Sequence, residues 1–153
     1  MHLFQYQSSR QTLSQGLVEY HNANPGLVNC RGCSPEARIF FKCHDAAHVV
    51  FGCGTTLDDE AAVKIASLFG TTAGARVLEG YRLHESIRIY RNLGLGEILV
   101  TAARSIGIVP RTIVKCARQR SRWPWENFDA YLAVPLHDIR QEFGIRVAHD
   151  IRP

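Results

Sequence analysis

The sequence predicts an all-α protein with a single domain, and three observations support this. A chain of 153 residues suits one domain of common size, and its 46% apolar content is enough to form a core. Apolar residues recur at helical spacing in segments that are separated by glycine, proline and capping residues. Only Tyr131 to Val134 has the character of a strand. We therefore expect one domain over residues 1–153, in which residues 1–33 form a first helix and a loop.

The helices of this bundle are bounded by capping residues and by stop signals. In chain order they are predicted to run from Ser8 or Ser9 to about His21, from Ser34 to about Phe51, from Thr55 or Thr56 to about Gly70, from Thr71 or Thr72 to Asn92, from Gly94 to Gly107, from Pro110 to Arg122, and from Pro135 to Phe143.

The boundaries in the first half of the chain have clear local causes. Ser34 can accept hydrogen bonds from the free amides of a helix start, and Pro35 fits the first helical position. Gly52 is expected to end that helix. The acidic residues 58–60 fill the first turn of the next helix, where they suit the helix dipole.

The second half of the chain contains weaker helix signals. Gly80 lowers the helix propensity of its segment without needing to break it. The Trp123-Pro124-Trp125 sequence forces a bend, because the residue before proline avoids helical geometry. Gly144 is expected to end the last helix.

The helix predicted over residues 34–51 contains the most informative side chains. It is apolar on nearly every side, which is typical of a buried helix, yet it contains His44, Asp45 and His48. His44 and His48 are four residues apart and therefore lie on one face, one turn apart, with Asp45 beside them. Burying such groups without partners would cost several kcal/mol, roughly. Something must therefore satisfy them.

A helical hairpin would add Glu60 to this group. His48 lies about four residues before the predicted turn, and Glu60 lies about four residues after it. In an antiparallel hairpin, His44, Asp45, His48 and Glu60 then converge. Two imidazoles and two carboxylates suit zinc, with iron or manganese as alternatives, whereas calcium prefers oxygen ligands alone. A buried polar network without metal is the competing interpretation, and the combined spacing favours a divalent metal site.

Two motifs resemble the ubiquinone (coenzyme Q) biosynthesis metal-motif family. The first is H-D-x-x-H, eleven residues and E, which begins at His44 and ends at Glu60. The second is similar to that family's closing P-L-x-x-[LI]-R-x-E-[LF]-G-I, and here it runs from Pro135 to Ile145. Two motifs at matching separation are much more specific than either alone. The resemblance covers about residues 35–147, within the region 34–153.

The resemblance implies an all-helical protein that binds zinc or a similar ion through His44, Asp45, His48 and Glu60. It implies a role in coenzyme Q synthesis, as a lyase that removes the C1 carboxyl of polyprenylated benzoate intermediates, coupled to hydroxylation there. The implied partners are a prenylated quinone precursor or another isoprenoid lipid, other ubiquinone-biosynthesis proteins, a second copy of the chain, and the membrane surface. Only 43 residues precede the motif, fewer than family members usually carry.

Two other classes of function stay open. One is a non-catalytic prenyl-lipid carrier or assembly scaffold with a structural metal, which four protein ligands would favour. The other is a hydrolase of the zinc-peptidase or HD-phosphohydrolase kind. The peptidase needs a general-base glutamate where Asp45 stands, and the phosphohydrolase needs further ligands, for which His137-Asp138 is a second pair. Roles for catalytic and substrate-binding residues cannot be assigned from spacing.

The charge and the cysteines add weaker constraints. The net charge is +4, and 15 of the 18 basic residues are arginines. The densest basic cluster contains Arg111, Lys115, Arg118, Arg120 and Arg122. An anionic partner or a solvated helix face would explain it, the second more simply, and no pattern of a nucleic-acid surface accompanies it. Five cysteines without a signal sequence or a membrane-spanning run indicate free thiols and a cytoplasmic protein. Cys30 and Cys33 form a CxxC pair for which chance thiols, a redox pair and half a metal site are open.

Overall fold

The computed structural model describes residues 1–25, 33–81 and 95–148, and within these ranges it contains helices and no strand. This confirms the all-α prediction. The elements are a 3-10 helix η1 (Leu3–Gln5), α1 (Leu13–Ala23), α2 (Pro35–Phe51), α3 (Leu57–Gly70), a 3-10 helix η2 (Gly74–Arg76), α4 (Val77–Tyr81), α6 (Leu95–Ala117), a 3-10 helix η3 (Asp129–Tyr131) and α7 (Leu136–Phe143).

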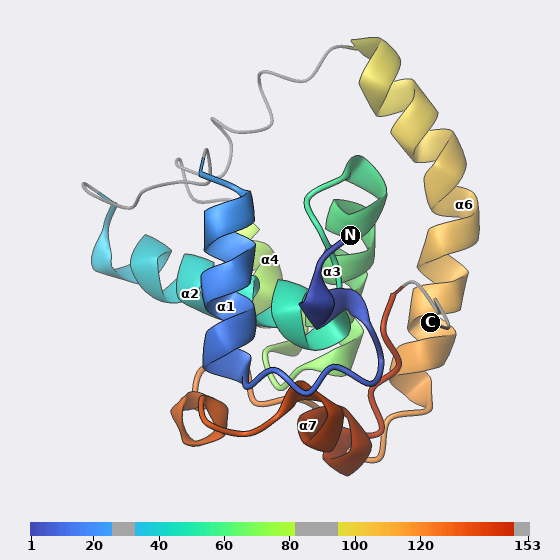
Figure 1. Ribbon diagram of the computed structural model, residues 1–153. Helices are drawn as coiled ribbons and strands as arrows, with labels where there is room; N and C mark the ends of the chain where they lie inside the picture. The colour runs from blue at the N-terminus through green and yellow to red at the C-terminus, as the bar shows by residue number, and fades with distance from the viewer. Residues whose placement is uncertain (26–32, 82–94, 149–153) are drawn as a thin grey trace.

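The bundle is arranged around α2, which packs against α1, α3 and α7. Figure 1 shows α6 curving along one flank of the molecule beside α3, and α7 lying at its base. The core contains most of the second half of α2, together with Phe4, Tyr20, Trp123 and Phe128. None of the helices in the described residues combines the length and the apolar character that a membrane span requires.

The first helix begins later than the sequence predicts. Thr12, rather than Ser8 or Ser9, is its cap, because Thr12 and Gln15 exchange side-chain and backbone hydrogen bonds. The carbonyl of Ser9 instead accepts a hydrogen bond from the amide of His137 at the start of α7. The hydrogen bond from His137 therefore occupies the carbonyl of Ser9, which would have accepted a hydrogen bond within α1 if Ser9 were its cap.

The two helices predicted over residues 94–107 and 110–122 are one helix that ends at Ala117, so that prediction was wrong. Pro110 lies inside α6. A proline removes one backbone hydrogen bond, but the helix continues here and Thr112 donates its hydroxyl to the carbonyl of Ile108 at 2.8 Å. Beyond Ala117 the chain turns, and the amide of Arg120 donates to the carbonyl of Phe143 in α7.

Two further segments differ from the prediction. The helix expected from residue 71 begins instead as the short helices η2 and α4, since Gly74 has a φ of 55° that a regular helix does not contain. Residues 82–94 of that predicted helix lie outside the described ranges. Tyr131 to Val134, which looked like a strand, forms the end of η3 and a turn.

Arg140 in α7 fixes the end of α2 against the N-terminal segment. Its side chain is 1% exposed, and its guanidinium donates to the carbonyls of Phe4, Tyr6, Val49 and Val50. Val49 and Val50 directly follow His48. The two sequence motifs are therefore in direct contact, and α7 supports the last turn of α2.

Candidate metal centre

The hairpin of α2 and α3 is built as its sequence predicts. The Ser34 hydroxyl accepts a hydrogen bond from the amide of Ala37 at the start of α2, and Gly52 ends this helix with a φ of 68°. Thr56 caps α3 and accepts the amide of Asp59. These boundaries confirm the predicted caps, and they set the register of the two helices.

This register brings His44, His48 and Glu60 together. One potential ligand atom from each of the three residues lies within 4.8 Å of the others. The two imidazole rings are 4.6 Å apart and nearly perpendicular, at 72°. The His48 side chain is fully buried, whereas the Glu60 side chain is 24% exposed. The cluster is thus buried on the α2 side and reachable on the α3 side.

The separation between His48 and Glu60 is compatible with two ligands of one ion. Nε2 of His48 lies 3.3 Å from Oε1 of Glu60, and this buried nitrogen has no aligned hydrogen bond within the described residues. Two ligand atoms about 2.0–2.1 Å from a tetrahedral zinc ion are separated by about 3.3 Å. The two side chains could therefore share a metal ion.

The other ring nitrogen of His48 is also placed for metal binding. Nδ1 lies 3.4 Å from the backbone carbonyl of Cys53. Because a carbonyl can only accept, Nδ1 is the donor in this contact, and Nε2 is the ring nitrogen that faces Glu60. Tyr20 stacks on the same ring, with the ring centres 5.0 Å apart. Together these contacts fix the orientation of the imidazole.

The electrostatics of His44 and Glu60 favour the protonation states that a metal requires. Burial, followed by the neighbouring His48, lowers the pKa of His44 to about 3, so this imidazole is neutral at physiological pH. Burial raises the pKa of Glu60, but its interactions with His48 and His44 outweigh that effect and lower it overall. Neutral imidazole and ionised carboxylate are the ligand forms for a divalent ion.

Asp45 occupies a different position from the other three predicted ligands. Its Oδ2 lies 2.9 Å from Nε2 of His21 in α1, and this hydrogen bond raises the pKa of His21 above its ordinary value. Within the described residues, the group that converges within 4.8 Å comprises His44, His48 and Glu60 and does not include Asp45. A ligand role for Asp45 stays a prediction.

The residues Tyr20 and His21 were not identified as site residues from the sequence. Tyr20 fitted the apolar stripe of its helix, and His21 stood at the predicted helix end. Their partners His48 and Asp45 are more than twenty residues away in sequence. No local spacing signal could have shown these contacts.

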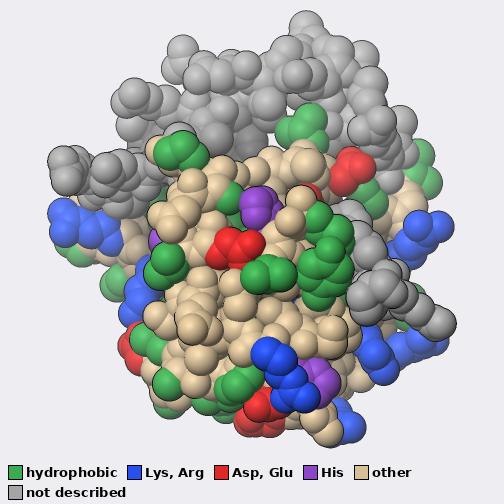
Figure 2. Space-filling model, viewed as in Figure 1, with side chains coloured by type: hydrophobic (Ala, Val, Ile, Leu, Met, Phe, Trp, Pro, Cys, Tyr) green, Lys and Arg blue, Asp and Glu red, His purple; other side chains and the backbone are tan. Residues whose placement is uncertain are grey.

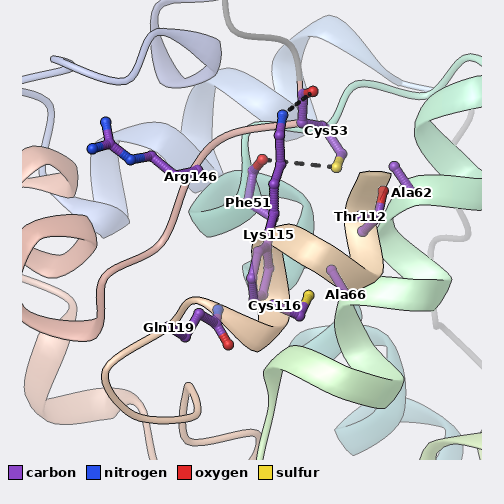
Figure 3. A pocket seen from close by; sticks show the side chains of 10 residues that line it. Phe51, Cys53, Ala62, Ala66, Thr112, Lys115, Cys116, Gln119 and Arg146 are labelled. Atoms are coloured by element: carbon purple, nitrogen blue, oxygen red, sulfur yellow. Dashed lines mark hydrogen bonds between the residues drawn. The ribbon is translucent and has the colours of Figure 1, made fainter. Parts of the chain in front are cut away.

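The cysteines near the hairpin are packing residues. Burial raises the pKa of the Cys53 thiol well above its ordinary value and that of Cys116 to about 11, so both stay protonated. Both line a small cavity of about 10 Å³ between α3 and α6 (Figure 3). Cys33, Cys43, Cys53 and Cys116 are free thiols, as expected, and Cys30 lies outside the described ranges.

The second histidine–aspartate pair does not join a metal cluster in the described part of the chain. His137 and Asp138 lie in α7, and Asp138 is 3.7 Å from the guanidinium of Arg10. His137 and Asp138 therefore do not supply the additional ligands that a phosphohydrolase would need.

The donor set of the cluster fits a divalent transition metal. Two imidazoles and one carboxylate are the ligands of many catalytic zinc sites, which leave a further position for water or substrate. Iron and manganese accept the same donors, and the donors alone do not select among them. No family model, no curated protein and no solved structure matches the chain, and the family resemblance therefore rests on the two sequence motifs.

Proposed function

We propose that this protein binds one divalent metal ion, zinc first, through His44, His48 and Glu60, and that it acts in ubiquinone biosynthesis. The main support for this proposal is that these three side chains converge and that the buried Nε2 of His48 faces Glu60. Contact between the two motifs, through Arg140 and the carbonyls after His48, supports family membership, since both motifs then serve one site.

The proposed reaction is removal of the C1 carboxyl of a polyprenylated benzoate. A bound ion would supply Lewis acidity toward a substrate carboxylate or ring oxygen. The chain's own residues prepare this site. Tyr20 and the Cys53 carbonyl hold His48, and the partly exposed carboxylate of Glu60 faces the side from which a ligand can arrive.

The isoprenoid part of such a substrate needs an apolar surface. Five apolar side chains near the hairpin are candidates for its wall. Two of them, Phe40 and Val49, are buried in the core. Phe41 and Leu68 are partly buried against it, and Leu78 is 48% exposed. Leu78 at α4 is thus the most accessible of the five for contact with a lipid tail.

The second candidate function is a non-catalytic carrier or scaffold for prenylated intermediates. The contact of Asp45 with His21 is the observation that bears on it. If Asp45 turns to the metal, four protein ligands close the site, which is typical of structural zinc. With three ligands, the site keeps an open position and favours catalysis.

The first experiment is metal analysis of the purified protein by mass spectrometry. We expect about one zinc, iron or manganese ion per chain, and much less in Glu60→Ala. Glu126→Ala is the matched control, because it makes the same change at an exposed position. Equal metal content in the native protein and in Glu60→Ala would contradict the site. Absence of metal from all three would favour a carrier with a buried polar network.

The second experiment tests the reaction with the metal-loaded protein. Incubation with a short-chain prenylated hydroxybenzoate, molecular oxygen and a two-electron reductant should release carbon dioxide from C1, measured with a labelled carboxyl carbon. One oxygen atom enters the ring hydroxyl and the other leaves as water. Release should fall to background in Glu60→Ala and persist in Glu126→Ala. Tight binding of the prenylated compound without release would instead support the carrier function.

A further inference from the structure

A second cleft lies at the base of the molecule, away from the metal cluster. Its volume is about 200 Å³, and it is open to solvent. Its lining comes from the N-terminal segment, the turn after α6, α7 and the chain after α7. The residues that line it are Gln7, Arg120, His137, Arg140, Gln141, Gly144, Ile145 and Arg146. None of the side chains that hold the metal cluster takes part.

The lining of the cleft is strongly basic. It contains three arginines and a histidine, and no aspartate or glutamate. Figure 2 shows basic, histidine and acidic side chains together at the lower edge of this face, where Figure 1 places α7. The positive charge of Arg120 and Arg146 is not offset by an ion pair with any carboxylate in the described part of the chain.

Arg140 adds a buried positive charge behind this surface. Its guanidinium is held by four backbone carbonyls, not by a carboxylate. Burial lowers the pKa of Arg140 to about 10, which still leaves it charged at physiological pH. Carbonyl dipoles satisfy its hydrogen bonds but do not cancel its net charge. An anion in the cleft would compensate that charge.

The backbone around the two exposed arginines is fixed. The amide of Arg120 donates to the carbonyl of Phe143 at 2.9 Å. Gly144 lies so close that an added Cβ would be 2.9 Å from this amide nitrogen. The backbone on both sides of Arg146 is bonded to the side chain of Gln7. Nε2 of Gln7 donates to the carbonyl of Ile145, and Oε1 of Gln7 accepts from the amide of Val147, each at 3.0 Å. The cleft is therefore preformed.

The acidic residues of α7 are directed to other partners. Glu142 accepts a hydrogen bond from the Tyr131 hydroxyl at 3.0 Å, and Asp138 faces Arg10 at 3.7 Å. Arg120 uses Nη1 for the carbonyl of Gln141, which leaves the remaining donors of its planar group for a ligand.

We propose that this cleft binds a phosphate group, carried either by a small phosphorylated molecule or by a phospholipid headgroup. Two guanidinium groups on fixed backbone match the several acceptor oxygens of a phosphate, to which arginine binds in two-point fashion. His137 adds a third donor at the rim. The site gives a function to Arg120, part of the basic cluster of the sequence, and it is independent of the proposed metal chemistry.

The test is a calorimetric titration of the full chain with inorganic phosphate at constant ionic strength. A metal chelator is present, so that phosphate cannot bind through an ion at the metal cluster. The variants are Arg120→Gln and Arg146→Gln, and the matched control is Arg118→Gln, which removes the same charge from an exposed side chain outside the cleft. Thermal unfolding of each variant checks that it folds.

A second arm identifies the source of the phosphate. The same four proteins are sedimented with phosphatidylcholine vesicles that contain or lack phosphatidic acid. We expect saturable binding in at least one arm, weakened about tenfold or more by each cleft variant and little by the control. Binding of inorganic phosphate alone indicates a soluble ligand, and binding of vesicles alone indicates a headgroup. Equal binding by all three variants, or binding in neither arm, would overturn the proposal.

Discussion

His48 and Arg140 are two of the buried polar side chains, and their hydrogen-bonding groups are satisfied in different ways. Each is at most 1% exposed. Arg140 donates to four backbone carbonyls, so its hydrogen-bonding groups are engaged within the fold. His48 has one nitrogen bonded to the Cys53 carbonyl, while its other nitrogen faces Glu60 without an aligned hydrogen bond.

This difference separates a structural role from a ligand-binding role. Burial of a polar group costs free energy unless it is hydrogen-bonded, and a fully bonded group stabilises one arrangement of the chain. A buried atom that is left without such a bond indicates that something else completes it. Arg140 is complete in the folded chain, whereas under the proposed function a bound ion would complete His48. Four substitutions can break or sharpen this contrast.

The largest expected effect is that of Arg140→Met. Four carbonyls in the core would lose their donor, and the contact between α7 and the end of α2 would be lost. We expect the free energy of unfolding in urea to fall by about 3–5 kcal/mol. Arg118→Met, at an exposed position, should change it by less than about 0.5 kcal/mol. A loss in Arg140→Met as small as in this control would contradict the structural role of Arg140.

The next effect is that of His48→Ala on metal-linked stability. For the native protein, zinc at about 100 times its dissociation constant should raise the free energy of unfolding by about 2.7 kcal/mol. His48→Ala should lose this increase, together with its metal content, when unfolding is measured with zinc and with a chelator. His137→Ala, in α7, should keep both. An equal zinc effect in His48→Ala and the native protein would remove His48 from the site.

A smaller effect is expected for Gly144→Ala at the end of α7. Gly144 has a φ of 70°, and an added Cβ would lie 2.9 Å from the Arg120 amide nitrogen. The left-handed conformation alone costs a non-glycine residue about 1–2 kcal/mol, measurable as a lower urea midpoint. Gly107→Ala, where an added Cβ meets nothing within 4 Å, is the control and should be neutral or stabilising. Equal stability of both variants would show that α7 adjusts freely.

The smallest effect is that of His21→Ala. An exposed pair such as His21 and Asp45 contributes about 1 kcal/mol or less to stability. If Asp45 is a fourth ligand, as the sequence predicts, removing its competing partner should tighten zinc binding by up to about fivefold. Competition with a chromophoric chelator measures this, and Asp45→Asn should weaken binding in the same assay. An unchanged affinity in both variants would exclude Asp45 from the site.

The sequence predicted best where structure depends on neighbouring residues. Ser34 and Gly52 bound α2 by local capping chemistry, and His44, His48 and Glu60 converge because helical spacing and one short turn set their positions. The all-α class followed from the same periodicity. These predictions needed no information about distant parts of the chain.

The predictions failed where distant contacts decide the structure. Ser9 does not cap α1, because its carbonyl is bonded to His137. The partners of Arg140 lie about ninety or more residues away in sequence, so its motif position gave no indication of the four carbonyls it binds. The pairing of Asp45 with His21 and the cleft at α7 are likewise products of tertiary packing.

The turn after α2 has a consequence for how related sequences can diverge. An added Cβ on Gly52 would lie 2.8 Å from the side chain of Val147, and the amide of Ala148 donates to the carbonyl of Phe51. The same turn carries the Cys53 carbonyl that orients His48. A change in the volume of residue 147 would therefore alter selection on residues 52 and 53. Among homologues, the tail and the hairpin turn should evolve as one co-varying unit, although about ninety residues separate them.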